Sequence, residues 1–104
     1  MTNSVPETTT KIAVREDIKE PPMFKLIYLN DNATAMDFVV DSLIEIFEYS
    51  PVTAEKITYD IHEDGSAVVA VLPYEIAEQK GIEVTVSARA QGYPLQVKLE
   101  PDET

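Results

Sequence analysis

Residues 24–39 hold the feature that most constrains the fold of this chain: an apolar run, then a polar loop, then the start of an amphipathic stretch. The apolar run is residues 24–29, and residues 30–32 (Asn-Asp-Asn) favour a turn because their side chains bond their own backbone. Thr34 is expected to cap a helix whose first turn contains Asp37, a favourable charge at that end. The stretch predicts strand, loop and helix, with loop oxygens beside the first helical turn. By themselves, these residue types favour a structural role in the turn and the cap.

Local signals of the same kind continue along the chain. Apolar residues at three-and-four spacing predict a helix over about 35–49. The Ser-Pro pair at 50–51 suits the start of a second helix over 51–62, and Gly65 suits its end. The remaining expected elements are a strand over about 67–72, a third helix that opens at Pro73, and a last strand over about 95–99.

Residues 82–88 allow two interpretations. Apolar and polar side chains alternate there, which taken alone predicts a strand. However, Val84 and Ala88 also have the spacing of one helical face. Gly81 would be an unfavourable residue inside a helix. The local pattern leaves both possibilities open.

Charge and composition exclude several classes of function. Eight basic and nineteen acidic residues give a net charge of −11, so the cationic surface that nucleic-acid binding requires is missing. The chain has no cysteine and His62 is its single histidine, which excludes thiolate and histidine metal clusters. No apolar stretch reaches membrane-spanning length, and no signal-peptide pattern opens the chain. A cytoplasmic protein without cofactor or membrane contact is expected.

A length of 104 residues predicts one domain with a single core. Residues 1–21 are expected to form a flexible tail, because Ile12-Ala13-Val14 is their only apolar cluster, and residues 22–104 to form the domain. The sequence shows no nucleophile with a base at plausible spacing, no phosphate-binding loop and no HExxH motif. Binding is therefore predicted rather than catalysis. The acidic excess favours basic or amine-bearing partners, and the alternative, which is the commoner meaning of such an excess, is a charge that only keeps the protein in solution.

Three segments together carry a resemblance to a known family. They are residues 21–40, with Asn30-Asp31 at the centre, residues 61–67 (Ile-His-Glu-Asp-Gly-Ser-Ala) and residues 94–100 (Pro-Leu-Gln-Val-Lys-Leu-Glu). Over roughly residues 21–100 the chain resembles the ClpS family, adaptor proteins that deliver substrates with N-terminal degradation signals to a Clp-type AAA+ protease. The resemblance implies a non-enzymatic, monomeric adaptor. Its partners would be N-degron substrates and the N-terminal domain of a Clp-type AAA+ ATPase.

The resemblance also implies one long helix over about 74–90, which includes the ambiguous segment. The predicted order is then βααβαβ, an α+β fold in which a three-stranded antiparallel sheet packs against three helices. The C-terminal domain of the ribosomal stalk protein resembles this architecture, so the fold alone does not settle the function. The alternative hypothesis is an acidic protein–protein interaction domain of the same fold with a different partner.

A site for a protein N-terminus follows from the same resemblance. An α-ammonium group needs hydrogen-bond acceptors, and the family positions that match Asn30, Asp31 and His62 contact it directly or through water. Glu75 and Lys80 match the positions that dock on the unfoldase. The positions that form the pocket for the first side chain match Asn32, Thr34, Met36, Val39, Thr58, Ile61 and Leu95.

Three residues depart from the family pattern. Asn32 replaces an acid, which weakens the negative field at the amine. Ala35 stands where a proline is usual. Thr58 stands where methionine is common, and because threonine is shorter by two heavy atoms, the pocket is expected to be wider near the β-carbon of the substrate residue. That width predicts better tolerance of β-branched first residues.

Overall fold

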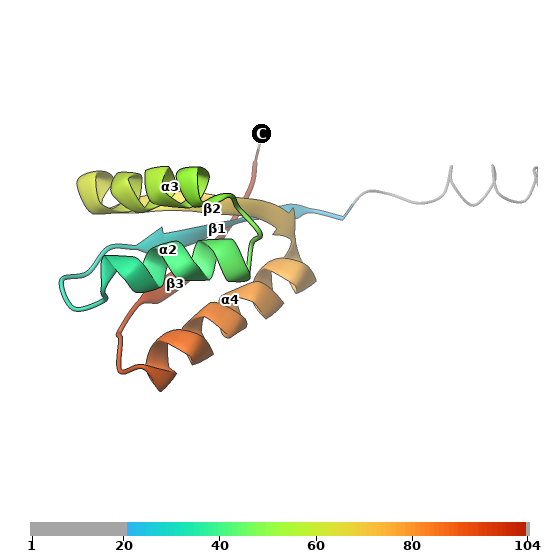
Figure 1. Ribbon diagram of the computed structural model, residues 1–104. Helices are drawn as coiled ribbons and strands as arrows, with labels where there is room; N and C mark the ends of the chain where they lie inside the picture. Colours follow the sequence, from blue (N-terminus) through green and yellow to red (C-terminus); the bar gives the residue numbers. More distant parts are fainter. Residues whose placement is uncertain (1–20, 104) are drawn as a thin grey trace, which may run out of the picture.

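The structure, a computed structural model, describes residues 21–103. Its elements are β1 (Met23–Leu29), α2 (Met36–Glu45), α3 (Pro51–Asp64), β2 (Ser66–Pro73), α4 (Tyr74–Ala90) and β3 (Gln96–Pro101). The strands form an antiparallel sheet in the order β2-β1-β3, and the helices lie over one face of it (Figure 1). The predicted βααβαβ order and α+β class are confirmed.

The predicted tail, residues 1–21, lies outside the described residues except for Pro21. Within the described part of the chain, none of the helices is both long and apolar enough to cross a membrane. In the same residues, no group of acidic or histidine side chains is arranged to hold a metal ion.

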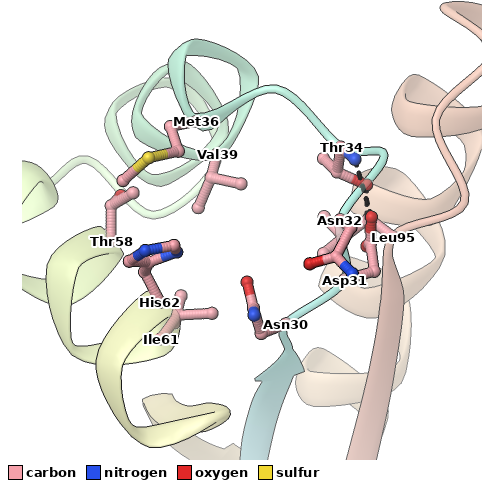
Figure 2. A pocket seen from close by; sticks show the side chains of 10 residues that line it. All are labelled: Asn30, Asp31, Asn32, Thr34, Met36, Val39, Thr58, Ile61, His62 and Leu95. Atoms are coloured by element: carbon pink, nitrogen blue, oxygen red, sulfur yellow. Dashed lines mark hydrogen bonds between the residues drawn. The ribbon is translucent and has the colours of Figure 1, made fainter.

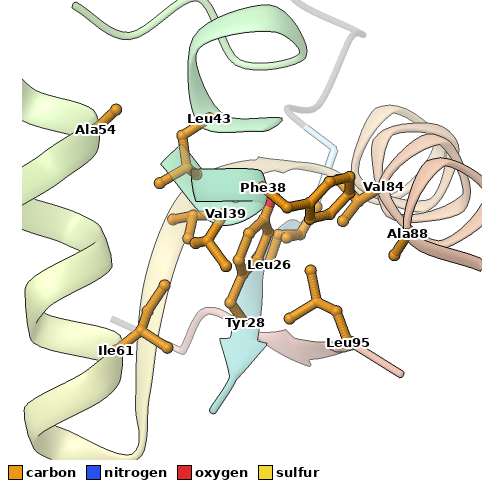
Figure 3. Packing of buried hydrophobic residues seen from close by; sticks show 11 residues of the cluster. Leu26, Tyr28, Phe38, Val39, Leu43, Ala54, Ile61, Val84, Ala88 and Leu95 are labelled. Carbon is orange, nitrogen blue, oxygen red and sulfur yellow. The ribbon is translucent and has the colours of Figure 1, made fainter. Parts of the chain in front are cut away.

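β1 is the central strand and carries the core of the domain. Its side chains Leu26 and Tyr28 point to the helix-covered face and are fully buried (Figure 3). Around them pack residues from all three helices, from β2 and from the position just before β3: Phe38, Val39, Leu43, Ala54, Ile61, Val69, Val84, Ala88 and Leu95. The site described below is therefore built on the same core that stabilises the fold.

A buried chain of hydrogen bonds joins β1 to α2. The Tyr28 hydroxyl lies 2.8 Å from the Ser42 hydroxyl, which donates to the Val39 carbonyl at 2.8 Å. Burial raises the pKa of the Tyr28 phenol, and the bond to Ser42 offsets this only in part, so Tyr28 stays protonated. Because the one hydroxyl hydrogen of Ser42 goes to Val39, Tyr28 is the donor in its bond to Ser42. This chain of bonds fixes Val39 relative to the central strand.

The ends of α3 agree with the sequence signals. Ser50 accepts a hydrogen bond from the backbone N–H of Thr53 at 3.3 Å, and Pro51 is the first helical residue. At the other end Gly65 adopts φ 90, the left-handed conformation that ends many helices, and its N–H donates to the Ile61 carbonyl at 3.0 Å. The helix extends slightly beyond the predicted range.

The start of α2 differs from the prediction. Ala35 is the N-cap, and its side chain makes no capping bond. Thr34, which the sequence favoured as the cap, instead donates its hydroxyl hydrogen bond to the Asp31 carboxylate at 2.8 Å. The prediction for Thr34 was wrong: the helix begins at Met36, so the cap position falls on Ala35, and the Thr34 side chain is held at the Asp31 carboxylate.

α2 is also shorter than predicted, since it ends at Glu45. The chain then turns through Glu48, which has a φ of 61, and the Lys80 ammonium donates to the Ile46 carbonyl at 2.9 Å. Lys80 thus satisfies a carbonyl that the end of the helix leaves free. The apolar periodicity extends further because Phe47 and the residues near it still pack on the core from outside the helix.

α4 is continuous through Gly81, so the implied helix over 74–90 is confirmed. Ala77, Val84 and Ala88 are fully buried on one face, whereas Ile82 and Val86 are 57% and 62% exposed. The alternation that resembled a strand therefore separates two faces of a helix.

Candidate functional site

All ten residues predicted to contact a substrate N-terminus line one pocket of about 180 Å³ (Figure 2). Four parts of the chain meet there: the loop after β1, the start of α2, the C-terminal half of α3 and the residue before β3. The lining residues are Asn30, Asp31, Asn32, Thr34, Met36, Val39, Thr58, Ile61, His62 and Leu95. The fold thus brings together positions that are up to 65 residues apart in the chain, from 30 to 95.

The deep part of the pocket is apolar and belongs to the core. Val39, Ile61 and Leu95 are 6%, 3% and 1% exposed, and Thr58 is 4% exposed. Met36 differs, because it is 48% exposed at the start of α2. A flexible thioether at this place forms an adaptable edge beside a fixed floor.

Polar side chains form part of the exposed rim of the pocket. Asn30 and His62 are both exposed and face the same space (Figure 2). A backbone bond holds them in place: the N–H of Asn30 donates to the carbonyl of Gly65 at 2.9 Å, just beyond the end of α3. This bond ties the end of β1 to the last turn of α3, which carries His62. Gly65, which the sequence predicted as the end of the helix, therefore also helps to position the site.

Asp31 organises the loop between β1 and α2. Its carboxylate accepts hydrogen bonds from the backbone N–H groups of Ala33 at 2.8 Å and Thr34 at 2.6 Å, and from the Thr34 hydroxyl at 2.8 Å. Partial burial raises the pKa of Asp31, but these three bonds, with a contribution from the charge of Arg89, lower it more, and the net pKa lies below the ordinary value. Asp31 is therefore an anion, and one of its roughly four lone-pair positions stays free.

The sequence of this chain matches a known family. The sequence model of the family described as "ATP-dependent Clp protease adaptor protein ClpS" matches residues 19–98. The chain belongs to the ClpS family. The family consists of adaptors of a protease and not of enzymes, which confirms both the implied family and the prediction of a non-enzymatic protein. It also favours the adaptor hypothesis over an acidic domain with an unrelated partner.

Individual ClpS proteins are similar over almost their whole length. The protein named ATP-dependent Clp protease adapter protein ClpS from Clostridium acetobutylicum is 41% identical over 88 residues, which cover 85% of this chain and 87% of that protein. The ClpS of Acetivibrio thermocellus is 40% identical over 96 residues, which cover 92% of this chain and 97% of that protein. A solved structure of Agrobacterium tumefaciens ClpS2 bound to L-phenylalaninamide is 36% identical. The two structures superpose with a TM-score of 0.77, and the match covers 80% of this chain and 100% of the ClpS2 chain.

Thr58, the departure from the ClpS pattern in the pocket floor, has its hydroxyl engaged within the helix. The Thr58 hydroxyl donates to the Ala54 carbonyl at 2.8 Å, one turn earlier in α3. The polar atom of this side chain is thus satisfied without a ligand. What remains for the pocket is a short, mainly apolar surface.

Arg89 supports the site, although the sequence analysis assigned it no role there. Its guanidinium donates to the carbonyls of Tyr93 and Leu95 at 2.9 and 2.8 Å, and Leu95 lines the pocket. The signal available in the sequence was a basic residue in the last turn of a helix, next to a glycine turn. Such residues often bond nearby carbonyls.

Glu75 and Lys80, the two residues matched to unfoldase docking, lie on α4 and not among the residues that line the pocket. Glu75 is exposed in the first turn of the helix. Lys80 is half-buried: besides its bond to Ile46, its ammonium lies over the ring of Phe47, 5.7 Å from the centroid. Lys80 therefore has a structural role in this fold whatever its role in docking.

Proposed function

We propose that this ClpS adaptor binds the free α-amine and the large apolar first side chain of N-degron substrates and delivers them to a Clp-type AAA+ ATPase. The observation that carries the proposal is the division of the pocket into a buried apolar floor and a rim of Asn30, Asp31 and His62. A protein N-terminus has the same division, with an ammonium group beside one side chain.

The pocket has a suitable size for one large side chain. Its volume is about 180 Å³, and an apolar cavity of roughly 150 Å³ can hold a benzene molecule. Burying one Leu or Phe side chain there would contribute on the order of 1.5–3 kcal/mol. The free lone-pair position of Asp31 would accept from the ammonium in a charge-assisted bond of roughly the same value.

The ligand of the similar ClpS2 structure supports this assignment. L-phenylalaninamide has a free α-amine, a benzyl side chain and an amide in place of the next peptide bond, so it is a minimal copy of a protein N-terminus with phenylalanine in the first position. That ligand belongs to the Agrobacterium tumefaciens protein. We extend it to this chain on the basis of the pocket chemistry described above.

Binding to peptides that differ only in residue one tests the proposal. Fluorescence anisotropy with labelled peptides should show binding when the first residue is Phe, Tyr, Trp or Leu, and much weaker binding when it is Ala. Acetylation of the N-terminus removes the charge and two donors, so it should abolish binding. Equal affinity for acetylated and free peptides would contradict the proposal.

Delivery needs a second contact, which we assign to Glu75 and Lys80 with the N-terminal domain of the ATPase. Because Lys80 also supports the fold, Glu75 gives the cleaner test. Glu75→Ala should reduce degradation of a Phe-started reporter by the Clp protease and leave peptide affinity unchanged. Glu83→Ala, a loss of an exposed acid on the same helix, is the matched control.

We expect the adaptor to act in the cytoplasm as a monomer.

A further inference from the structure

Arg89 closes the turn between α4 and β3 with a single nitrogen atom. Its Nη1 donates to the carbonyl of Tyr93 at 2.9 Å and to the carbonyl of Leu95 at 2.8 Å. Arg89 is itself exposed, so these bonds hold a surface turn from its solvent side. The guanidinium is well suited to this, because its donors are rigidly arranged and always charged.

The rest of the turn is fixed up to Tyr93 by other contacts. Gly92 has a φ of 82 and donates to the Arg89 carbonyl at 3.0 Å, and the N–H of Tyr93 donates to the Ala88 carbonyl at 2.9 Å. The ring of Tyr93 packs on Phe38 with 5.3 Å between centroids. These contacts would keep Tyr93 in place without the arginine side chain.

Leu95 depends more strongly on Arg89. The ladder between β1 and β3 begins at the pair Leu29–Gln96, one residue after Leu95. Leu95 is 1% exposed and forms one wall of the pocket, opposite the residues of α3 (Figure 2). The Leu95 side chain is held by the core, and the bond from Arg89 to its carbonyl is the hydrogen bond that the structure gives to its backbone immediately before the strand.

We infer that Arg89 is a positioning residue that sets the selectivity of the pocket for large first side chains, by fixing the Leu95 wall from outside the pocket. The inference rests on the proposed function, since it concerns the substrate side chain that Leu95 would contact. Arg89 would not touch the substrate. Loss of its two bonds would let the wall move, and loosened walls would reduce the contacts made by a large side chain far more than those made by a methyl group.

The test compares amino-acid amides that share one amine and differ in side chain. Phenylalaninamide, leucinamide and alaninamide are titrated by NMR into the full chain, into Arg89→Ala and into Gln91→Ala, a change of an exposed residue at the same end of α4. A difference of one methylene in an apolar pocket changes affinity roughly 10- to 200-fold. We therefore expect Arg89→Ala to lower the ratio of phenylalaninamide to alaninamide affinity about tenfold, with Gln91→Ala leaving it unchanged.

A loss of positive charge near Asp31 would affect all three amides alike, because all three present the same ammonium. An equal change for all three amides, or an unchanged ratio, would overturn the inference. Arg89→Lys is the second variant in case Arg89→Ala does not fold. It keeps the charge without the planar fork, so the ratio of phenylalaninamide to alaninamide affinity should fall, but less than in Arg89→Ala. A ratio equal to that of the parent would also count against Arg89.

A readout without ligand separates this inference from the proposed function. The Leu95 methyl resonances and the hydrogen exchange of the amides at 95 and 96 are measured in the free protein. Arg89→Ala should shift the methyl resonances and speed exchange, whereas Gln91→Ala should not. If the parent binds none of the amides, the proposed function fails while the dependence of Leu95 on Arg89 can still be seen. Unchanged methyl resonances and exchange would overturn the positioning role directly.

Discussion

Replacing Asp31 by asparagine is the most informative perturbation of the site. Asp31 has two roles in this structure, since its carboxylate holds the loop through Ala33 and Thr34 and would also accept from the substrate ammonium. Asparagine keeps one oxygen for the two backbone N–H groups, and its amide can donate to the Thr34 hydroxyl instead of accepting from it. Asp31→Asn therefore preserves the loop and removes the charge.

The expected magnitude follows from the type of bond that is lost. A hydrogen bond to a charged group contributes roughly 1.5–3 kcal/mol. In Asp31→Asn the oxygen is taken by the two backbone N–H groups, and the amide nitrogen, a donor, replaces the oxygen that would accept from the ammonium. The Asn variant should thus lose the whole bond, about 1.5–3 kcal/mol, or a roughly 10- to 150-fold weaker Kd. Asp31→Ala loses the same bond and the loop bonds as well, so its Kd should weaken at least as much.

Anisotropy titration of a Phe-started peptide measures both variants, with Asp37→Asn as the control. Asp37 is exposed in the first turn of α2 and is not among the residues that line the pocket, so it changes the net charge equally. Parent-like affinity for Asp31→Asn, or the same loss for both Asn variants, would refute the reasoning. The second result would show that only the general negative field matters.

The pH dependence gives an independent check on the same group. The pKa of Asp31 is lowered from an ordinary value of 3.8, so the stability gained from its loop bonds is complete above that value and is lost as the pH falls through the lower native pKa. Asp31 should therefore cause no change in affinity between about pH 5 and 7. Above about pH 8 the peptide α-amine, with a pKa of about 7.7–8.0, loses its proton and binding should weaken. That weakening should be smaller in Asp31→Asn.

Three other predictions address different parts of the molecule. Thr58→Met places a longer side chain in a floor position that is 4% exposed, so it should lower affinity for Ile-started relative to Leu-started peptides by about 1–3 kcal/mol at most; an unchanged ratio in competition titrations would remove Thr58 from the pocket. Lys80→Met removes the bond to the Ile46 carbonyl at the end of α2, and chemical denaturation should show a loss of about 1 kcal/mol, whereas a fully stable variant would leave that bond without a role. Deletion of residues 1–17, which lie outside the described residues, should leave melting temperature and peptide affinity unchanged but stop delivery to the protease. Normal degradation with the shortened chain would show that the tail is dispensable.

Local sequence signals predicted those parts of the fold that local physics determines. Ser50, Pro51 and Gly65 define α3 through bonds within a few residues, and each acts in the structure as its residue type predicts. Local signals could not predict the end of α2, because a contact made there is not local. The Lys80 ammonium binds the Ile46 carbonyl, and this bond spans 34 residues of sequence. The apolar periodicity also continues past Glu45, because the turn that follows still packs on the core.

The ambiguous segment in α4 shows where periodicity alone fails. Alternation from 82 to 88 is compatible with a strand, and only the burial of Ala77, Val84 and Ala88 against the sheet selects the helix. Those contacts are non-local and cannot be read from the segment itself. The resemblance to ClpS supplied the missing information, as it did for the ten residues of the pocket. The role of Arg89 could not be predicted from the sequence, because the two carbonyls that it binds belong to a turn whose geometry no sequence pattern specified.

The arrangement of the pocket also explains which parts of it can set specificity. Val39, Thr58, Ile61 and Leu95 are at most 6% exposed without any ligand, so the floor exists before binding and costs no ordering of these side chains. Asp31 is likewise fixed by its own loop. Met36, at 48% exposure, is the lining side chain with the most freedom to adapt among the apolar ones. A rigid floor rewards a side chain that fills it, while an adaptable edge tolerates differences in shape near the mouth. Selectivity for size should therefore reside in the positions held by the core and by Arg89. Tolerance of branching should reside in the adaptable Met36 and in the space that the short, fixed Thr58 side chain leaves free.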